Sequence, residues 1–139
     1  MIIADTGGIL ALLDADDRHH QTVRKAFEAE GDRWLLPWAI LPEIDYLASR
    51  HLGVKVALAF GQDVASGVFR VEGYVGEDMR RGIGLQQKYP ALRLGLVDSI
   101  VMAIAVRHRA SAIVTVDARH FRAVSLNVRP PPRLIPLDA

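Results

Sequence analysis

The stretch of residues 94–121 constrains the fold of this chain most, because it joins an apolar helix pattern to a short β-rich run. Apolar residues recur at helical spacing over 97–105, and residues 112–116 then form a run typical of a buried strand. Each element carries one acid: Asp98 lies at the start of the helix, and Asp117 follows the strand. Because ligands of open α/β sheets bind beyond the carboxyl ends of strands, Asp117 is a candidate site residue.

Each of these acids, considered alone, also has a purely structural interpretation. A carboxylate such as Asp98 stabilises the positive end of a helix dipole, and Asp117 suits the first position of an Asx turn. A functional interpretation therefore depends on whether other acids reach the same edge of the sheet.

Asp5 is the next acid that does so. Residues 2–4 are a short apolar run that ends at Asp5, and residues 6–8 are then expected to turn the chain into an apolar segment. Strand, acid, glycine turn and helix are the pattern of a first βα unit, which places Asp5 at a carboxyl end too. The pair Gly7-Gly8 is a weak signal for a phosphate-binding loop, because the patterns GxGxxG and GxxxxGKT are absent.

Glu43 is the fourth acid expected at this edge. Residues 34–36 predict a second strand, and the apolar face of residues 40–51 predicts a helix after it. Pro42 either kinks this helix or begins it. In both cases Glu43 lies near the start of a helix that follows a strand, a position where glutamate also favours the helix dipole.

The remaining pattern indicates an α/β fold. Asp16 or Asp17 is the expected N-cap of a helix that Gly31 ends. Strands that alternate with helices predict a parallel sheet covered on both faces, and a length of 139 residues predicts a single domain over 1–139. The helix that Gly31 ends is expected at 18–30, further helices at 54–64 and 77–89, and further strands at 68–71 and 134–135.

The composition excludes several kinds of site. The chain has no cysteine, which rules out a disulfide framework, a thiolate metal site and a cysteine nucleophile. The N-terminus lacks the basic segment of a signal peptide, and no apolar run reaches the roughly 18 residues that span a bilayer. We therefore expect a cytoplasmic protein that does not enter a membrane.

The charge is unevenly distributed along the chain. Residues 1–79 hold 7 Lys and Arg against 13 Asp and Glu, and residues 80–139 hold 10 against 3, which gives −6 and +7. Such an asymmetry favours binding of nucleic acid or of another acidic partner.

Four carboxylates in one pocket require a compensating charge. Asp5, Glu43, Asp98 and Asp117 can all reach the carboxyl edge of such a sheet, where they would repel one another unless a cation lay between them. Since no histidine or cysteine stands at a workable spacing, oxygen ligands alone predict a hard ion, Mg²⁺ or Mn²⁺. Such an ion polarises a phosphate, activates water and stabilises the leaving oxygen, so the pocket suits phosphoryl chemistry.

Four motifs, in this order, resemble the PIN domain, and more closely the VapC toxins of bacterial toxin–antitoxin pairs. They are Asp5-Thr6, Pro42-Glu43, the segment 94–98 that ends in Asp98, and residues 115–121, TVDARHF. The resemblance covers nearly the whole chain, because its length and the order of its elements also fit. Each motif is weak alone, but the four together are fairly specific.

By this resemblance the fold is a single PIN-like domain with a five-stranded parallel sheet between helices. The implied activity is Mg²⁺-dependent endoribonuclease cleavage of RNA. Asp5 and Asp98 correspond to the principal metal ligands, while Glu43 and Asp117 complete the acidic pocket and orient the attacking water.

The resemblance also implies supporting residues and partners. Thr6 and Thr115 match positions that support the acids by hydrogen bonds. VapC-like proteins typically form homodimers, and a cognate antitoxin blocks the pocket; the RNA substrate is a tRNA or a ribosomal RNA, and the residues do not distinguish the two. This chain departs from the family at Gly7, where Ser or Asn is frequent, and at Pro42, where the family helix usually runs on.

Basic residues around the acids are expected to contact the phosphates of the RNA. Phe121 is expected to be an apolar anchor for the turn after Asp117, and His120 either packs in the loop or contacts a phosphate. The expected RNA contacts are Arg93, Arg107, Arg119, His120 and Arg122.

Two competing functions stay open. One is a Mg²⁺-dependent phosphatase with an aspartate nucleophile, but such enzymes commonly carry a second Asp where this chain has Gly7. The other is a PIN-like module that binds RNA or a protein partner without cutting; the four acids argue against it, while Gly7 leaves it open. Metal-dependent RNA cleavage separates the nuclease from the binder, and phosphate release from small monoesters identifies the phosphatase.

Overall fold

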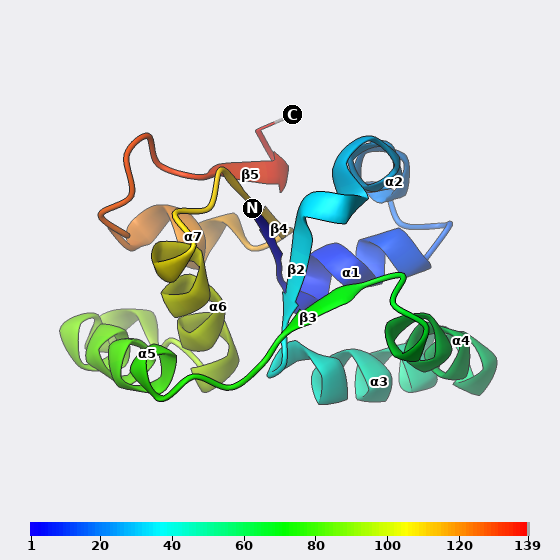
Figure 1. Ribbon diagram of the computed structural model, residues 1–139, viewed down its shortest axis with the longest axis horizontal. Helices are drawn as coiled ribbons and strands as arrows, with labels where there is room; N and C mark the ends of the chain where they lie inside the picture. Colours follow the sequence, from blue (N-terminus) through cyan, green and yellow to red (C-terminus); the bar gives the residue numbers. More distant parts are fainter. Residues whose placement is uncertain (139) are drawn as a thin grey trace.

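The computed structural model describes residues 1–138 and contains a five-stranded parallel sheet with the strand order β3-β2-β1-β4-β5 (Figure 1). The α/β class and the five-stranded parallel sheet that the sequence predicts are therefore confirmed. The strands are β1 (Ile2–Ala4), β2 (Trp34–Pro37), β3 (Arg70–Glu72), β4 (Ala112–Thr115) and β5 (Arg133–Pro136).

Helices cover both faces of the sheet. In Figure 1, α1 to α4 lie on the right of the strands and α5 to α7 on the left. The helices are α1 (Thr6–Leu13), α2 (His20–Glu30), α3 (Ile40–His51), α4 (Val54–Ala65), α5 (Gly76–Lys88), α6 (Leu96–Arg107) and α7 (Ala118–Ala123), with short 3-10 turns at Gly31–Arg33 and Pro90–Leu92.

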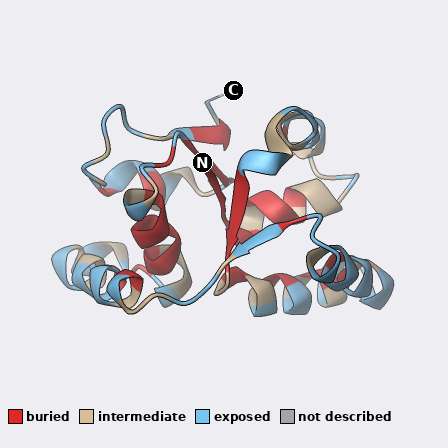
Figure 2. Ribbon diagram, viewed as in Figure 1, coloured by how far each residue is buried: buried red, intermediate tan, exposed pale blue. Residues whose placement is uncertain are grey.

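The core lies on both sides of the central strands. Every residue of β1, β2 and β4 is buried, and so is every residue of α6 from Ser99 to Ala105, whereas the edge strand β3 is mostly exposed (Figure 2). A helix that is apolar around its whole circumference must be enclosed, and α6 is enclosed between the sheet and α5. No helix in residues 1–138 is both long enough and apolar enough to cross a membrane.

The predicted glycine turn after Asp5 is wrong, because Gly7 and Gly8 belong to α1. Both glycines are needed for close packing against β4 and the residue that follows it. A Cβ atom on Gly8 would lie 2.4 Å from the carbonyl oxygen of Val114, and one on Gly7 would lie 2.7 Å from Cγ2 of Val116. The glycines therefore let α1 approach the neighbouring strand, rather than cradle a phosphate.

Gly8→Ala is expected to destabilise the fold by about 1–3 kcal/mol, because the backbone of Val114 has no room to move away from an added methyl group. The matched control is Gly61→Ala on α4, where a Cβ meets no atom within 4 Å. That change is expected to stabilise the helix by roughly 0.5–1 kcal/mol. Urea denaturation measures both changes, and a Gly8→Ala protein as stable as the wild type would contradict the packing argument.

The start of α2 also differs from the prediction. The N-cap is His19, and neither Asp16 nor Asp17 caps the helix; Asp17 instead accepts a hydrogen bond from the His19 amide at 2.7 Å. Gly31 has a right-handed φ of −58° and begins a 3-10 turn, so it is not a left-handed helix terminator. Tight turns among the preceding aspartates delay the start of the helix until His20.

Pro42 leaves α3 intact. The helix begins at Ile40, so Pro42 is its third residue. An amide at that position has no partner within the helix, and its loss to the proline ring costs no helical hydrogen bond. Neither alternative that the sequence left open, a kink at Pro42 or a start at Pro42, describes the helix.

Candidate active site

The four predicted acids follow strands or begin helices at one edge of the sheet. Asp5 follows β1 directly, and Asp117 is the second residue after the neighbouring strand β4. Asp98 lies in the first turn of α6, and Glu43 lies in the first turn of α3, which follows β2. The topology places them all at the carboxyl edge, as the sequence predicts.

Asp5 is the most deeply buried of the four. Its side chain caps α1, accepting a hydrogen bond from the Thr6 amide at 2.8 Å, and its other oxygen accepts one from the Thr115 hydroxyl at 2.9 Å. Burial first, and then the negative charge of Asp98, raise the pKa of Asp5 to about 7, and Glu43 adds a smaller contribution in the same direction. The site therefore holds an acid whose charge the surrounding protein only partly compensates.

Asp98 is half-buried, and its charged form is disfavoured by burial and by neighbouring acids, as that of Asp5 is. Burial raises the pKa of Asp98 most, and the negative charges of Asp117 and Glu43 raise it further, while a hydrogen bond from His120 lowers it. Glu43 raises the pKa of Asp98 as well as that of Asp5, so its charge acts on both acids. The four carboxylates thus form one electrostatically coupled group.

His120 joins two of these acids, which the sequence did not predict. Its Nδ1 lies 3.0 Å from a carboxylate oxygen of Asp98 and 3.0 Å from one of Asp117. The expectation that no histidine stands at a workable spacing is therefore wrong. The signal that could have revealed it is the i,i+3 spacing of Asp117 and His120, which brings the two side chains together once α7 is recognised as a helix.

The predicted turn after Asp117 is wrong, because the short helix α7 stands there. Asp117 is the N-cap of α7 and accepts a hydrogen bond from the His120 amide at 3.2 Å. Phe121 is buried under the helix, so its predicted role as an apolar anchor is confirmed. Asp117 was expected in an Asx turn that opens a loop; its side chain instead caps a helix, and the same side chain lies beside His120 and Asp98.

The donor set fits a divalent cation. Asp98, Asp117 and His120 each offer one ligand atom, and these atoms lie within 4.8 Å of one another. Asp5 and Glu43 add negative charge to this set. Burial first, and then the neighbouring acids, raise the pKa values of Asp5 and Asp98, and a bound cation would favour the charged form of both. With imidazole present, the set is mixed rather than oxygen-only.

The two threonines support Asp5 in different ways. The Thr115 hydroxyl donates to Asp5 and also accepts a hydrogen bond from the Asp117 amide at 3.0 Å, so it connects two of the acids. Thr6 contributes its backbone amide, whereas its buried hydroxyl has no hydrogen-bond partner in residues 1–138. The hydrogen-bonding support expected of Thr6 therefore comes from its main chain.

Thr115→Val removes this hydroxyl with almost no change in shape, and we expect it to reduce catalytic activity about 10–100-fold. Loss of the hydrogen bond raises the pKa of Asp5 further, so the acid limb of the pH–rate profile is expected to move to higher pH. Thr22→Val, at an exposed position of α2, is the matched control. A reduced rate with an unchanged profile would show that Thr115 acts only through stability.

Arg107 is not available for RNA, which corrects the sequence-based expectation. Its guanidinium donates to both carboxylate oxygens of Asp78, at 2.9 and 2.8 Å, and lies 3.5 Å from Glu72. Asp78 is 1 % exposed, so this ion pair fastens the end of α6 to the start of α5. It lies at the end of α6 opposite Asp98.

The other residues predicted to contact RNA differ in their exposure and in their ion pairs. Arg122 forms an ion pair with Asp138 at 2.5 Å, but about half of its side chain stays exposed. Arg93 and Arg119 are exposed and form no ion pair within residues 1–138, and Arg119 lies in the first turn of α7, beside Asp117. His120 contacts acids rather than the surface, so its orientation does not favour the phosphate contact expected of it.

Comparison with known proteins agrees with the fold. Residues 2–126 match the model of the PIN domain family. The sequence is 28 % identical over 123 residues to Ribonuclease VapC26 of Mycobacterium tuberculosis, covering 88 % of this chain and 91 % of that protein.

Solved structures show the same fold. VapC20 of Mycobacterium tuberculosis, a toxin that cleaves the sarcin-ricin loop, superposes with a TM-score of 0.79 at 20 % identity, covering 88 % of this chain and 95 % of that one. The DNA-bound VapBC complex of Salmonella typhimurium contains a chain that superposes with a TM-score of 0.70 at 18 % identity, covering 96 % and 95 %. Because the family match extends over nearly the whole chain and the acids meet at one edge, the chain belongs to the PIN domain family.

Proposed function

We propose that this protein is a VapC-type endoribonuclease that hydrolyses RNA phosphodiester bonds in its acidic pocket with the help of Mg²⁺ or Mn²⁺. The observation that carries the proposal is the group of four acids at one edge of the sheet, where burial first, and then the charges of Asp98 and Glu43, raise the pKa of Asp5 to about 7. A silent module has no need to maintain this unfavourable arrangement, whereas a metal-dependent nuclease uses it to bind its cation.

Each residue of the pocket has a distinct task in this proposal. Asp5 and Asp98 hold the cation, and Glu43 and Asp117 complete the pocket and orient the attacking water. The bound cation would polarise the phosphate and stabilise the charge that develops on the leaving oxygen. The Thr115 hydroxyl keeps Asp5 aimed into the pocket, and His120 aligns Asp98 with Asp117.

The proposed substrate is a structured RNA. One relative is named a ribonuclease, and a structural neighbour is a toxin that cleaves the sarcin-ricin loop. Ribosomal RNA and transfer RNA both remain candidate substrates for this chain.

A cognate antitoxin is the proposed protein partner, because the neighbours include VapBC complexes and a toxin–antitoxin complex from Klebsiella pneumoniae. We further propose a homodimer in the cytoplasm. Light scattering on the purified protein measures the oligomeric state, and a monomer at all concentrations would refute the dimer.

The test is cleavage of purified total RNA by the antitoxin-free protein, with Mg²⁺, with Mn²⁺ and with EDTA. We expect a few discrete fragments that EDTA abolishes, and sequencing of their ends identifies the bond that is cut. RNA binding without cleavage would replace the nuclease with a binding module. Release of phosphate from small monoesters without RNA cleavage would indicate a phosphatase.

A further inference from the structure

His120 brings a ring nitrogen among the acids of the pocket. Its Nδ1 lies 3.0 Å from Oδ2 of Asp98 and 3.0 Å from Oδ2 of Asp117, and the three residues each offer a ligand atom within 4.8 Å of the others. The three side chains are 19 %, 24 % and 36 % exposed, so an ion from solvent can reach them. Two elements, the first turn of α6 and the start of α7, bring these atoms together.

A single hydrogen on Nδ1 does not account for both of these contacts. A ring nitrogen carries at most one hydrogen, and the contact with Asp98 is a hydrogen bond. The contact with Asp117 has the same length and is an ion-pair contact. Neighbouring ligands of an octahedral ion, each about 2.1 Å from it, lie about 3 Å apart. Both distances therefore also suit a nitrogen and two oxygens that share one cation.

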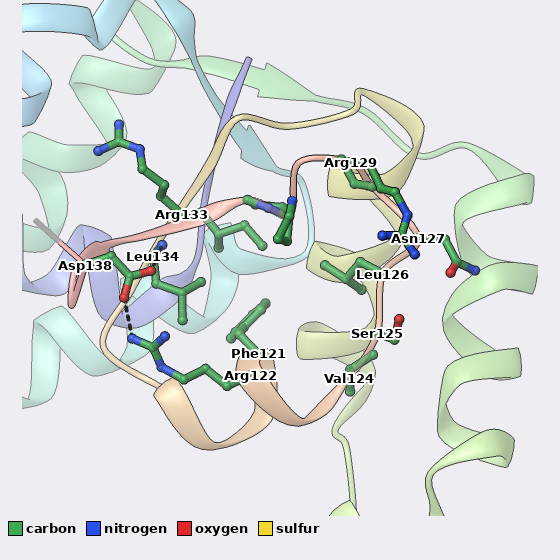
Figure 3. A pocket seen from close by; sticks show the side chains of 14 residues that line it. Phe121, Arg122, Val124, Ser125, Leu126, Asn127, Arg129, Arg133, Leu134 and Asp138 are labelled. Carbon is green, nitrogen blue, oxygen red and sulfur yellow. Dashed lines mark hydrogen bonds and ion pairs between the residues drawn. The ribbon is translucent and has the colours of Figure 1, made fainter.

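The short helix α7 holds the ring in this position. The Asp117 side chain accepts a hydrogen bond from the His120 amide at 3.2 Å, which fixes the two residues relative to each other. Farther along the helix, Phe121 is buried in a groove between α7 and the C-terminal segment, and Arg122 forms an ion pair with Asp138 (Figure 3). A ligand atom that is already held in place loses little freedom when it binds an ion.

An imidazole ligand changes which ion a carboxylate pocket prefers. Mg²⁺ takes oxygen ligands and keeps its waters, carboxylates suit both Mg²⁺ and Mn²⁺, and imidazole favours transition ions. The group of three ligand atoms contains one imidazole, and the chain has no cysteine to add a thiolate. Two carboxylates with one nitrogen therefore suit Mn²⁺ better than Mg²⁺, and they lack the thiolate or second imidazole that is usual in zinc sites.

We propose that Nδ1 of His120 is a direct ligand of the cation, beside the carboxylates of Asp98 and Asp117, and that it makes the pocket prefer Mn²⁺ to Mg²⁺. This inference rests on the proposed function, and it decides between the two ions that the proposed function leaves open. The ring that binds the ion is neutral and carries its hydrogen on Nε2. In the cation-free protein the same nitrogen aligns the two acids, so both roles use one geometry.

The first measurement detects the nitrogen ligand directly and needs no variant. The wild-type protein, without RNA, receives one equivalent of MnCl₂, and electron spin-echo envelope modulation of the frozen sample reports any nitrogen bound to Mn²⁺. We expect a nitrogen coupling that changes when the histidines are labelled with ¹⁵N and that is lost in His120→Asn. Bound Mn²⁺ without a nitrogen coupling in the wild type would overturn the inference.

Calorimetric titration with MnCl₂ and with MgCl₂ measures the preference between the ions. In His120→Asn an amide oxygen can take the place of Nδ1, which leaves a set of oxygen ligands only. We expect this variant to bind Mn²⁺ at least about tenfold more weakly than the wild type and to bind Mg²⁺ within about threefold of it. Equal weakening for the two ions would show that His120 only positions the acids, which would overturn its role as a ligand.

Two further variants act as controls. His51→Asn, at the exposed last residue of α3, is the matched control and is expected to leave both affinities and the nitrogen coupling unchanged. His120→Phe keeps an aromatic ring and removes its nitrogens, so it is expected to lose the coupling as His120→Asn does. Circular dichroism shows whether each variant is folded.

The outcomes distinguish this inference from the proposed function. A nitrogen coupling in the Mn²⁺-loaded wild type together with absent RNA cleavage would overturn the nuclease and leave the histidine ligand. Metal-dependent RNA cleavage without a nitrogen coupling would overturn the histidine ligand and leave the nuclease intact. Tighter Mn²⁺ binding by His120→Asn would show that the ring obstructs the cation, which would also overturn the inference.

Discussion

Asp98→Asn is expected to reduce the rate of RNA cleavage by at least about 100-fold. Loss of a residue that merely orients a metal ligand costs about 10–100-fold, and loss of a charged ligand itself costs more. Asp98 is half-buried at the start of α6, and its charge is opposed by Asp117 and Glu43. In the proposed mechanism it is one of the two residues that hold the cation. The measurement is a single-turnover cleavage rate at saturating Mg²⁺.

The matched control is Asp63→Asn on α4, which removes a carboxylate of the same kind from an exposed position. We expect this control to cleave at the wild-type rate. Equal cleavage by wild type and Asp98→Asn would remove Asp98 from the mechanism, and it would also raise the question of a contaminating nuclease. A higher Mg²⁺ requirement in Asp98→Asn, with partial recovery of the rate, would support its role as a ligand.

The stability of the cation-free protein is expected to fall as the pH rises from about 4 to about 7, because of Asp5. The pKa of Asp5 is raised, by burial first and then by the charge of Asp98, from its ordinary 3.8 to about 7. Between these two values the folded protein keeps a proton that the unfolded chain has lost. Raising the pH through this window therefore favours unfolding, by up to about 4 kcal/mol for the Asp5 carboxyl.

Asp5→Asn isolates this contribution, since asparagine has nearly the same shape and carries no charge. In EDTA, we expect the variant to be more stable than the wild type at pH 8 and similar to it at pH 4, as measured by urea denaturation. At pH 8, Mg²⁺ is expected to stabilise the wild type and to have little effect on the variant, because a cation that binds only the folded state adds to its stability. If the difference in the free energy of unfolding between the wild type and Asp5→Asn were the same at pH 4 and pH 8, this assignment would be contradicted.

The sequence predicted most of the sheet and the acids because these features are encoded locally. Asp5 directly follows a three-residue apolar strand, and Asp98 lies in the first turn of a helix that is apolar all round. The spacing of the apolar residues and the position of each acid beside them therefore suffice to place both acids. The α7 helix was missed because it has only six residues, too few for its period to be evident, and the role of His120 was missed with it.

Other features depend on tertiary contacts that no local pattern reveals. Arg107 was expected at the RNA because of its charge, but its partner Asp78 stands 29 positions away and meets it only when α5 packs on α6. Gly8 appeared to belong to a turn, and only the close approach of Val114 explains why glycine stands inside a helix. Pairings of this kind require the fold before they can be recognised.

The hydrogen bond between Asp5 and Thr115 also has a consequence for the order of events during synthesis. It joins residues 110 positions apart, across strands that lie side by side in the sheet. At about 5–20 residues per second, a ribosome needs roughly 6–22 s to translate the intervening chain. Until then Asp5 lacks both the neighbouring strand β4 and its hydroxyl partner, so the acidic group can assemble only after most of the chain has left the ribosome.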